Sequence, residues 1–255
     1  MWDPGSYLVF DDYRARPFRD LVHRIGAEAP RRIVDIGCGA GNRTLELVAR
    51  WPAAAIEAFD SSPEMVAAAR ERGIAAEVAD VRDWTPAPDT DVAVTNAVLQ
   101  WIPDHPELLR RWAGQLPAGA WFAMQVPGNF AAPSHVLLRA QIADPAWRSR
   151  LDGVTVRDVN AVLDPEGYAR LFAEAGYAVD AWETTYLHRM SGADPVLEWM
   201  TGTAMRPIKS VLSDADWHEF RAALAPGLRA AYPVRPDGST WFPFRRVFVV
   251  ARAPA

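Results

Sequence analysis

Short apolar segments that alternate with amphipathic stretches constrain the fold of this chain most. Five segments read as strands, and the first three carry an aspartate at or near their end: 31–36, 54–60, 75–80, 91–97 and 121–126. Helical patterns lie between strands at about 42–50, 63–72 and 106–116. In the first helix we expect Leu45 and Val48 to face inward. The alternation predicts a doubly wound, mostly parallel sheet whose strands all end at one edge, where ligands bind.

The second half of the chain departs from this alternation. Two segments read as insertions, and a helix and two strands complete the pattern: insertions at about 127–164 and 190–242, a helix at about 165–175, and strands at 177–190 and 245–253. Two late strands without a crossover predict an antiparallel edge strand, and therefore a seven-stranded α/β sheet. We predict one domain over residues 1–255, in which the N-terminal segment, about 1–28, and both insertions cap the active site.

The turn after the first predicted strand contains Gly37, Gly39 and Gly41 in the pattern G-x-G-x-G. Glycine permits positive φ and lets a ligand approach the backbone, and the turn opens a helix whose N-terminal amides attract negative groups. A dinucleotide site has its third glycine one residue later, where it makes room for a pyrophosphate. Asp35, two residues before the first glycine, would repel a pyrophosphate but suits an ammonium group. The turn therefore favours a ligand other than a dinucleotide.

Two further acids fall at the same edge of the predicted sheet. Asp60 ends the second strand, where a carboxylate can accept hydrogen bonds from both ribose hydroxyls, and Asp80 ends the third strand, beside the place of an adenine amino group. Acids at strand ends also cap turns, so any one of them is as typical of a structural role as of binding. Three acids together with the glycines indicate a nucleoside-binding site.

Composition excludes several classes of function. The net charge is −5 and no run of lysine and arginine occurs, which argues against a nucleic-acid partner. No stretch approaches the roughly 20 apolar residues of a membrane span. The N-terminus lacks a secretory pattern, so we expect a cytoplasmic protein with no membrane partner. The five histidines and the single Cys38 show no zinc-ligand spacing, so no metal is expected.

The motifs around these residues carry a resemblance to known enzymes. DIGCGAGN at 35–42, Asp60-Ser61-Ser62, Asp80-Val81 and Thr95-Asn96-Ala97 resemble the class I S-adenosylmethionine-dependent methyltransferases, which have a Rossmann-like fold. More specific blocks resemble the trans-aconitate 2-methyltransferases within that superfamily: SYLVFDDYRARPFRDLV at 6–22, NAVLQWIPDHPELL at 96–109, AMQVPGNFAAPSHVLLR at 123–139, TTYLHRMSG at 184–192, MRPIKSVL at 205–212 and WFPFRRVFVVAR at 241–252. The resemblance covers nearly the whole chain, including both insertions.

The resemblance implies S-adenosyl-L-methionine as cofactor and a small-molecule polycarboxylate as substrate. It implies that the three glycines line the cofactor, with Asp35 near its methionine amino group and Asp60-Ser61 at its ribose. Asp80 and Val81 are implied to frame the adenine, and Asn96 and Ala97 to lie under the ribose and methionine portion. The product would be a monomethyl ester of trans-aconitate.

A carboxylate needs no general base to accept a methyl group, because it is already anionic at neutral pH. We therefore expect no catalytic residue in the strict sense, with the reacting group positioned by Trp101 and Tyr7. The other carboxylates of the substrate need cationic partners. The candidates for substrate binding are Tyr7, Arg14, Arg16, Trp101, Arg206 and Lys209. Each has a structural alternative: a solvated surface charge for the basic residues, and packing for the two aromatic residues.

Other functions remain open alternatives. The enzyme could methylate another small or carrier-bound carboxylic acid, although the sequence shows no basic docking patch for a carrier. A non-catalytic S-adenosylmethionine-binding protein would be expected to carry an effector domain, and none is evident. An NAD-dependent oxidoreductase is disfavoured by the position of the third glycine. Methylation of nucleic acid is disfavoured by the acidic balance of the chain.

Overall fold

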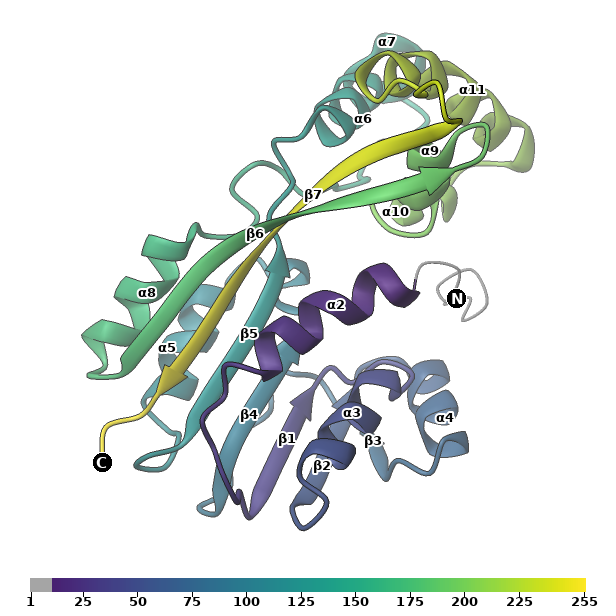
Figure 1. Ribbon diagram of the computed structural model, residues 1–255. Coiled ribbons are helices and arrows are strands. Elements are labelled where there is room, and N and C mark those ends of the chain that lie inside the picture. The colour runs from purple at the N-terminus through teal and green to yellow at the C-terminus, as the bar shows by residue number, and fades with distance from the viewer. Residues whose placement is uncertain (1–10) are drawn as a thin grey trace. The chain divides into compact units, whose positions relative to one another are not determined.

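The computed structural model of the protein describes residues 11–255 and divides into two compact units (Figure 1). The first unit comprises the chain up to Pro127, residues 162–184 and residues 246–255, and the second comprises residues 128–161 and 185–245. Two long strands, β6 (Ala178–Ser191) and β7 (Ser239–Arg252), contribute residues to both units. The second unit corresponds closely to the two segments that the sequence sets apart as insertions. Their action as a cap over the active site stays a prediction.

A mixed sheet of seven strands in the order β3-β2-β1-β4-β5-β7-β6 organises the first unit. Its first five strands along the chain are β1 (Arg32–Ile36), β2 (Ala55–Asp60), β3 (Ala76–Val78), β4 (Thr90–Asn96) and β5 (Trp121–Pro127). These five pair in parallel, whereas β7 is antiparallel to β5 and lies between it and the edge strand β6. The predicted class, a doubly wound and mostly parallel seven-stranded α/β sheet with an antiparallel strand at one side, is confirmed. The strand order reverses between β1 and β4, which is the place where such sheets bind ligands.

Helices cover both faces of this sheet (Figure 1). On one face, α5 (His105–Ala113) and α8 (Pro165–Glu174) contribute Leu109, Trp112 and Phe172 to the main apolar core, where they pack with Phe122 of β5. The other face carries α2 (Asp11–Val22), α3 (Asn42–Arg50) and α4 (Pro63–Glu71). Buried aliphatic surface on both faces supplies the main stabilisation of such a layered fold.

The rotation of α3 about its axis differs from the prediction. Leu45 and Val48 are 41% and 37% exposed, so the expectation that they face inward is wrong. Thr44 and Leu47 are the residues of this helix that are fully buried. The reason is polar: the Thr44 hydroxyl donates a 2.6 Å hydrogen bond to the buried carboxylate of Asp35, and this bond holds the Thr44 face of the helix against the sheet.

The second unit consists of helices and the distal halves of the two long strands. Its helices are α6 (Pro133–Ala143), α7 (Pro145–Arg148), α9 (Pro195–Thr201), α10 (Arg206–Lys209) and α11 (Asp214–Ala231). An aromatic cluster forms its core, in which His188 lies against Trp199, Phe242 and Phe244 with ring centroids 5.2 to 6.3 Å apart. The strand β7 begins at Ser239, six residues before its predicted start, and its residues 239–245 belong to the second unit.

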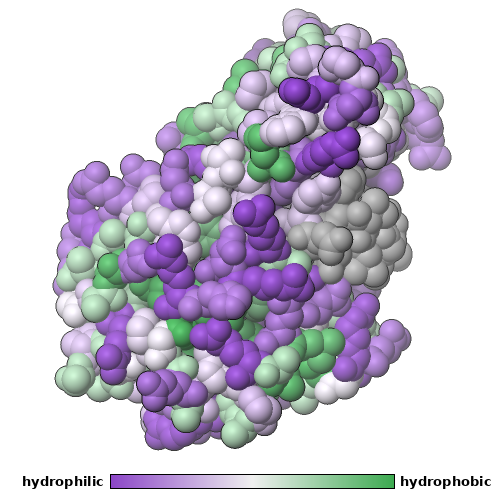
Figure 2. Space-filling model, in the orientation of Figure 1, coloured by the Kyte–Doolittle hydropathy of each residue, from purple (hydrophilic) through white to green (hydrophobic). Residues whose placement is uncertain are grey.

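The surface is mixed in character. Hydrophilic and hydrophobic residues are interspersed on the face shown in Figure 2, with hydrophilic residues covering much of it. Among the described residues, no helix combines the length and the apolar character that crossing a membrane requires.

Candidate functional site

The glycine-rich turn between β1 and α3 lies at the carboxyl edge of the sheet, and its three glycines have different tasks. All three have positive φ: 75° at Gly37, 56° at Gly39 and 79° at Gly41. A Cβ on Gly37 would clash with Val98, and one on Gly41 would lie 3.1 Å from the Cβ of Ala69. A Cβ on Gly39 meets no atom within 4 Å. The outer two glycines therefore allow close packing, whereas the space over Gly39 is open to a ligand.

Asp60, at the end of β2, is held by main-chain hydrogen bonds on both of its oxygens. Oδ2 accepts from the amide of Gly39 at 2.9 Å, and Oδ1 accepts from the amide of Ser62 at 2.9 Å. A carboxylate can accept about four hydrogen bonds, so roughly two positions remain for hydroxyl donors of a ligand. These bonds fix the orientation of the carboxylate beside the glycine turn, as a ribose-binding acid requires.

Asp35, in β1, is only 2% exposed. Burial raises the pKa of Asp35 to about 6, the Thr44 hydroxyl opposes this rise, and the nearby charge of Asp60 adds to it. Two carboxylates thus lie near each other at the glycine turn. A cation bound there would be attracted by both of them.

The end of β4 presents buried polar atoms to the same edge. Asn96 is partly buried, and its Oδ1 has no hydrogen-bond partner among the described residues. Ala97 has a positive φ of 58°, which is uncommon for a residue with a side chain. Its main chain is fixed on both sides, because its amide donates to the carbonyl of Gln125 at 2.8 Å and its carbonyl accepts from Nε2 of Gln100 at 2.6 Å. Such a rigid, strained backbone with an orphaned acceptor is typical of a binding site.

The third strand end is arranged differently from the first two. Both oxygens of Asp80 accept hydrogen bonds from Arg82, and these bonds lower the pKa of Asp80 to about 2. Val81 is buried in the main core beside Trp84. Ser61 is exposed directly after Asp60. Contacts of Asp80, Val81 and Ser61 with a nucleoside therefore stay predictions, and the structure shows other partners for the first two.

The predicted substrate-binding residues are scattered through the chain. Tyr7 lies outside the described residues, as does the side chain of Arg14. Arg16 is exposed on α2, and Trp101 is 46% exposed at the end of the short 3-10 helix Leu99–Trp101 that follows β4. Two more belong to α10 of the second unit, where Arg206 is partly buried and Lys209 is exposed. Their action on a substrate stays a prediction for all six.

Sequence reasoning missed several polar residues that shape this edge. Thr44 binds Asp35, and Arg246, only 5% exposed, donates to Oε1 of Gln125 at 3.1 Å. The spacing of Thr44, nine residues after Asp35 and inside the helix that follows the turn, is the one sequence signal that could have found the first pair. His105 begins α5 as expected, and its Nε2 lies 2.8 Å from the buried hydroxyl of Tyr168, which gives it a structural partner.

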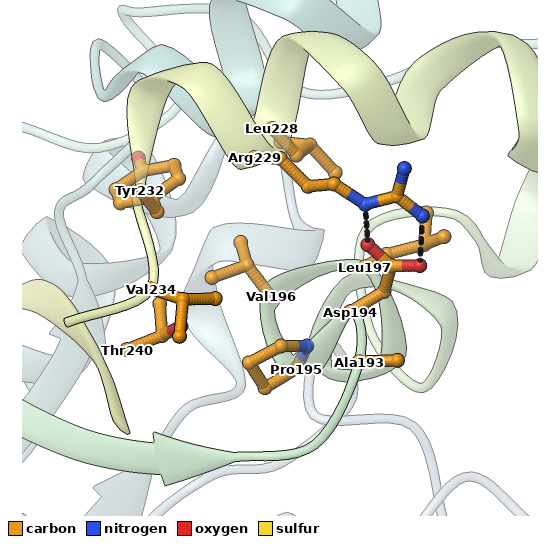
Figure 3. A pocket seen from close by; sticks show the side chains of 10 residues that line it. All are labelled: Ala193, Asp194, Pro195, Val196, Leu197, Leu228, Arg229, Tyr232, Val234 and Thr240. Carbon is orange, nitrogen blue, oxygen red and sulfur yellow. Dashed lines mark hydrogen bonds and ion pairs between the residues drawn. The ribbon is translucent and has the colours of Figure 1, made fainter. Parts of the chain in front are cut away.

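A small recess in the second unit has the character of a structural contact (Figure 3). Its charged residues are paired, since Nε and Nη2 of Arg229 donate to the two oxygens of Asp194 at 2.6 and 2.7 Å. The pairing lowers the pKa of Asp194 and joins α11 to the start of α9. No group of three or more histidine, cysteine, aspartate or glutamate residues arranged to hold a metal is found within residues 11–255.

The residues at the glycine turn fit S-adenosylmethionine. The space above Gly39 accommodates a ligand, Asp60 retains acceptor capacity, and the buried Oδ1 of Asn96 lacks a partner among the described residues. The carboxylates of Asp35 and Asp60 suit the positive charges of this cofactor.

Comparisons with known proteins agree with this geometry. The sequence model of a family described as "Methyltransferase domain" matches residues 10–181. Trans-aconitate 2-methyltransferase of Rhodococcus jostii (strain RHA1) is 61% identical over 252 residues, which cover 99% of each chain. The protein of the same name from Mycobacterium tuberculosis (strain ATCC 25177 / H37Ra) is 53% identical, over 98% of this chain and 96% of that one. The chain belongs to the family of trans-aconitate 2-methyltransferases.

Solved structures confirm the methyltransferase fold of this family member. The YcgJ protein of Bacillus subtilis superimposes with a TM-score of 0.60 at 14% identity, over 94% of this chain and 99% of that one. Phosphoethanolamine N-methyltransferase 2 of Haemonchus contortus, in complex with S-adenosyl-L-methionine, gives a TM-score of 0.54 at 14% identity. That match covers 94% of this chain and 53% of the other.

Proposed function

We propose that the protein transfers a methyl group from S-adenosylmethionine to a carboxylate of trans-aconitate and forms a monomethyl ester. The observation that carries this proposal is the similarity to trans-aconitate 2-methyltransferases, 53 to 61% identical over almost the full length. The similarity extends over 99% of the chain and therefore includes the segments of the second unit. The proposal includes a cytoplasmic location, which fits the single Cys38 and its inability to form an internal disulfide.

The chain's own residues supply binding and orientation. Asp60 accepts the ribose hydroxyls, and it is held ready by the amides of Gly39 and Ser62. Oδ1 of Asn96, which has no partner among the described residues, accepts a hydrogen bond from the cofactor. Asp35 and Asp60 together attract the ammonium group of the cofactor. When bound, the cofactor supplies an activated methyl group, which an anionic carboxylate accepts without loss of a proton.

The proposed methyl transfer requires no general base, because the accepting carboxylate is already anionic at neutral pH. His105 is buried with its two ring nitrogens engaged by Ile102 and Tyr168, and burial lowers its pKa. Catalysis by such an enzyme depends on placing two bound reactants in line, which supplies as much as ~7–11 kcal/mol in favourable cases. Exclusion of water adds to the effect, because a hydrated carboxylate is a poor nucleophile.

Methyl transfer to a panel of acids tests the proposal. The enzyme and radiolabelled S-adenosylmethionine are incubated with trans-aconitate, cis-aconitate, isocitrate, citrate or a long-chain fatty acid, and base-labile label is counted. We expect trans-aconitate to be labelled with the highest kcat/KM. Preferential labelling of another acid would favour the alternative, a methyltransferase for a different carboxylic acid. No labelling by a protein that binds the cofactor would leave the non-catalytic alternative.

A further inference from the structure

A row of residues crosses the sheet of the first unit at its carboxyl edge. The register of the parallel strands places Asp60 of β2, Gly37 after β1 and Asn96 of β4 at one level. Asn96 in turn pairs directly with Gln125 of β5, and all four residues belong to the first unit. Because neighbouring strands lie about 4.8 Å apart, the row spans about 14 Å from Asp60 to Gln125. Its last member, Gln125, is not among the site residues predicted from the sequence.

Gln125 lies on the same face of the sheet as Asp60 and Asn96. On β5, Phe122 and Met124 belong to the apolar core of the opposite face, so the alternation of the strand places Gln125 on the face that carries α2. The helix α2 packs against β5 there (Figure 1), and Gln125 is only 1% exposed. A hydrogen bond made by this side chain is therefore screened from water, which strengthens it.

The orientation of the Gln125 amide follows from its one printed bond. Its Oε1 accepts a hydrogen bond from Nη1 of Arg246 at 3.1 Å. Since only the oxygen of an amide accepts such a bond, Nε2 is the end that faces away from this contact. Nε2 is buried and has no hydrogen-bond partner among the described residues. In the described part of the first unit, it is the one buried side-chain amide nitrogen without a partner.

The neighbouring amide of Asn96 presents the opposite character. Its Oδ1 is a buried acceptor without a partner among the described residues, so the two amides do not satisfy each other although they are adjacent in register. Buried polar atoms without partners are unfavourable, and native proteins commonly satisfy them with a ligand or an ordered water. This part of the edge thus offers an acceptor on β4 and a donor on β5.

The donor on β5 suits the second reactant better than it suits the cofactor. In the proposed binding, Asp35 and Asp60 of β1 and β2 attract the ammonium group of the cofactor. The carboxylate of the cofactor is joined to the same carbon atom as this ammonium group, so it stays close to it. Gln125 lies two strands beyond β1, about 10 Å away. An acceptor that reaches Nε2 of Gln125 therefore belongs to a molecule bound beside the cofactor.

We propose that Nε2 of Gln125 donates a hydrogen bond to the carboxylate of the substrate that accepts the methyl group. The proposal rests on the proposed function, since it specifies the residue that orients the reacting group. The reacting carboxylate is the part of the substrate that must lie against the cofactor, and β5 is the next strand beyond the row of Asp60, Gly37 and Asn96. A neutral amide donor orients the carboxylate and leaves its negative charge in place. Burial of the donor keeps water from the reacting oxygens.

The test compares three variants by calorimetric binding of trans-aconitate in the presence of S-adenosylhomocysteine, and by kcat and KM. Gln125→Met removes the amide, and Gln125→Glu keeps an acceptor for Arg246 but replaces the donor with a second acceptor. Gln115→Glu is the control, because Gln115 is an exposed glutamine of the same unit that precedes β5, at the other edge of the sheet.

Both substrate affinity and turnover should depend on the donor. We expect Gln125→Met to raise Kd and KM for trans-aconitate about 10- to 100-fold, the range for a hydrogen bond to a charged group. Gln125→Glu should raise them further, because it adds a like charge. In both variants kcat should also fall, since a carboxylate that is not oriented is seldom in line with the methyl group. Gln115→Glu should change none of these values, and Gln125→Met should leave the Kd for S-adenosylhomocysteine unchanged.

Three results would overturn the inference. The first is an unchanged Kd for trans-aconitate in folded Gln125 variants, as expected if water satisfies the donor. The second is an equal loss of affinity for S-adenosylhomocysteine in Gln125→Met, which would assign the donor to the cofactor. The third is an unchanged kcat in both variants, which would separate Gln125 from the reacting carboxylate.

Melting temperatures show whether the variants fold, and Gln125→Glu should melt near the wild-type temperature because it keeps the bond from Arg246. The inference and the proposed function fail separately. Wild-type protein that binds trans-aconitate with an affinity that depends on Gln125, but does not methylate it, would overturn the proposed function alone. Methylation of trans-aconitate that is equally fast in the Gln125 variants would overturn the inference alone.

Discussion

The carboxyl edge of the first unit's sheet carries acids, whereas the loop and helix that follow it in the second unit carry arginines. Asp35 and Asp60 lie close enough for the charge of one to raise the pKa of the other. Arg139 and Arg157 lie close enough to lower the pKa of His135 together. The two regions therefore differ in the sign of the charge that acts on their buried titratable groups.

The largest expected effect on this comparison comes from removing Asp60, the acid that we expect to bind the ribose. Asp60→Ala should raise the Kd for S-adenosylmethionine about 1,000-fold, since two charge-assisted hydrogen bonds of about 1.5–3 kcal/mol each are lost. Calorimetric titration measures the change. Asp91→Ala is the control, because Asp91 also accepts bonds from a main-chain amide and an arginine, but at the opposite edge of the sheet, where β4 begins. An unchanged Kd for S-adenosylmethionine in a folded Asp60→Ala protein would show that this acid does not bind the cofactor.

The second prediction concerns the stability cost of the buried acid. The folded-state pKa of Asp35, about 6, is above the unfolded value of 3.8, so the folded state holds the proton more tightly. This contribution to the free energy of unfolding is fully present below pH 3.8 and is lost as pH rises through about 6. Its size is about 3 kcal/mol.

Urea denaturation at a series of pH values checks this linkage. The difference in unfolding free energy between Asp35→Asn and wild type should grow in favour of the variant as the pH rises from 4 to 7. Subtracting the variant removes the opposite trend of the other carboxylates. A difference that stays constant across this range would show that Asp35 ionises as it does in the unfolded chain.

The two regions also differ in how far the sequence alone predicts them. The strands β1 to β5 begin and end within two residues of their predicted bounds, because hydrophobic periodicity and turn residues specify a regular sheet. Asp35, Asp60 and Asn96 reach one edge for the same reason: parallel strands with crossovers end together. The edge of this sheet is a consequence of topology, so residue spacing was enough to find it.

The rotation of helices and the burial of polar residues depend on side-chain contacts, which hydrophobic periodicity does not predict. Leu45 and Val48 were predicted inside because they are apolar, but the hydrogen bond of Thr44 to Asp35 sets the rotation of that helix. Asn129 and Arg157 come from irregular loops, where burial of a polar residue follows from packing and not from pattern. Sequence reasoning therefore named other arginines of the chain, Arg14, Arg16 and Arg206, as candidates for binding a carboxylate.

The third prediction concerns a smaller effect at the glycine turn. It distinguishes the loss of space for a ligand, which lowers cofactor affinity, from backbone strain, which lowers stability. Gly39→Ala and Gly73→Ala both place a Cβ at positive φ, 56° and 83°, with no atom within 4 Å. Each should lose about 1 kcal/mol of stability. Only Gly39→Ala should also weaken S-adenosylmethionine binding, about tenfold, because only its Cβ enters the space beside Asp60. Equal cofactor affinity in the two variants would place the ligand away from this turn.

The smallest expected effect concerns Asp80, the acid that the structure sets apart from the other two. Asp80 is tied to Arg82, and both side chains are partly exposed, so Asp80→Ala should change the free energy of unfolding by less than about 1 kcal/mol. Glu166→Ala is the matched control, since Glu166 forms a comparable exposed pair with Arg170. If Asp80 accepts the adenine amino group, its loss should raise the cofactor's Kd about two- to tenfold, the value of one hydrogen bond, and Glu166→Ala should not. A Kd equal to that of the control would leave Asp80 with a purely structural ion pair and confine the acidic region to Asp35 and Asp60.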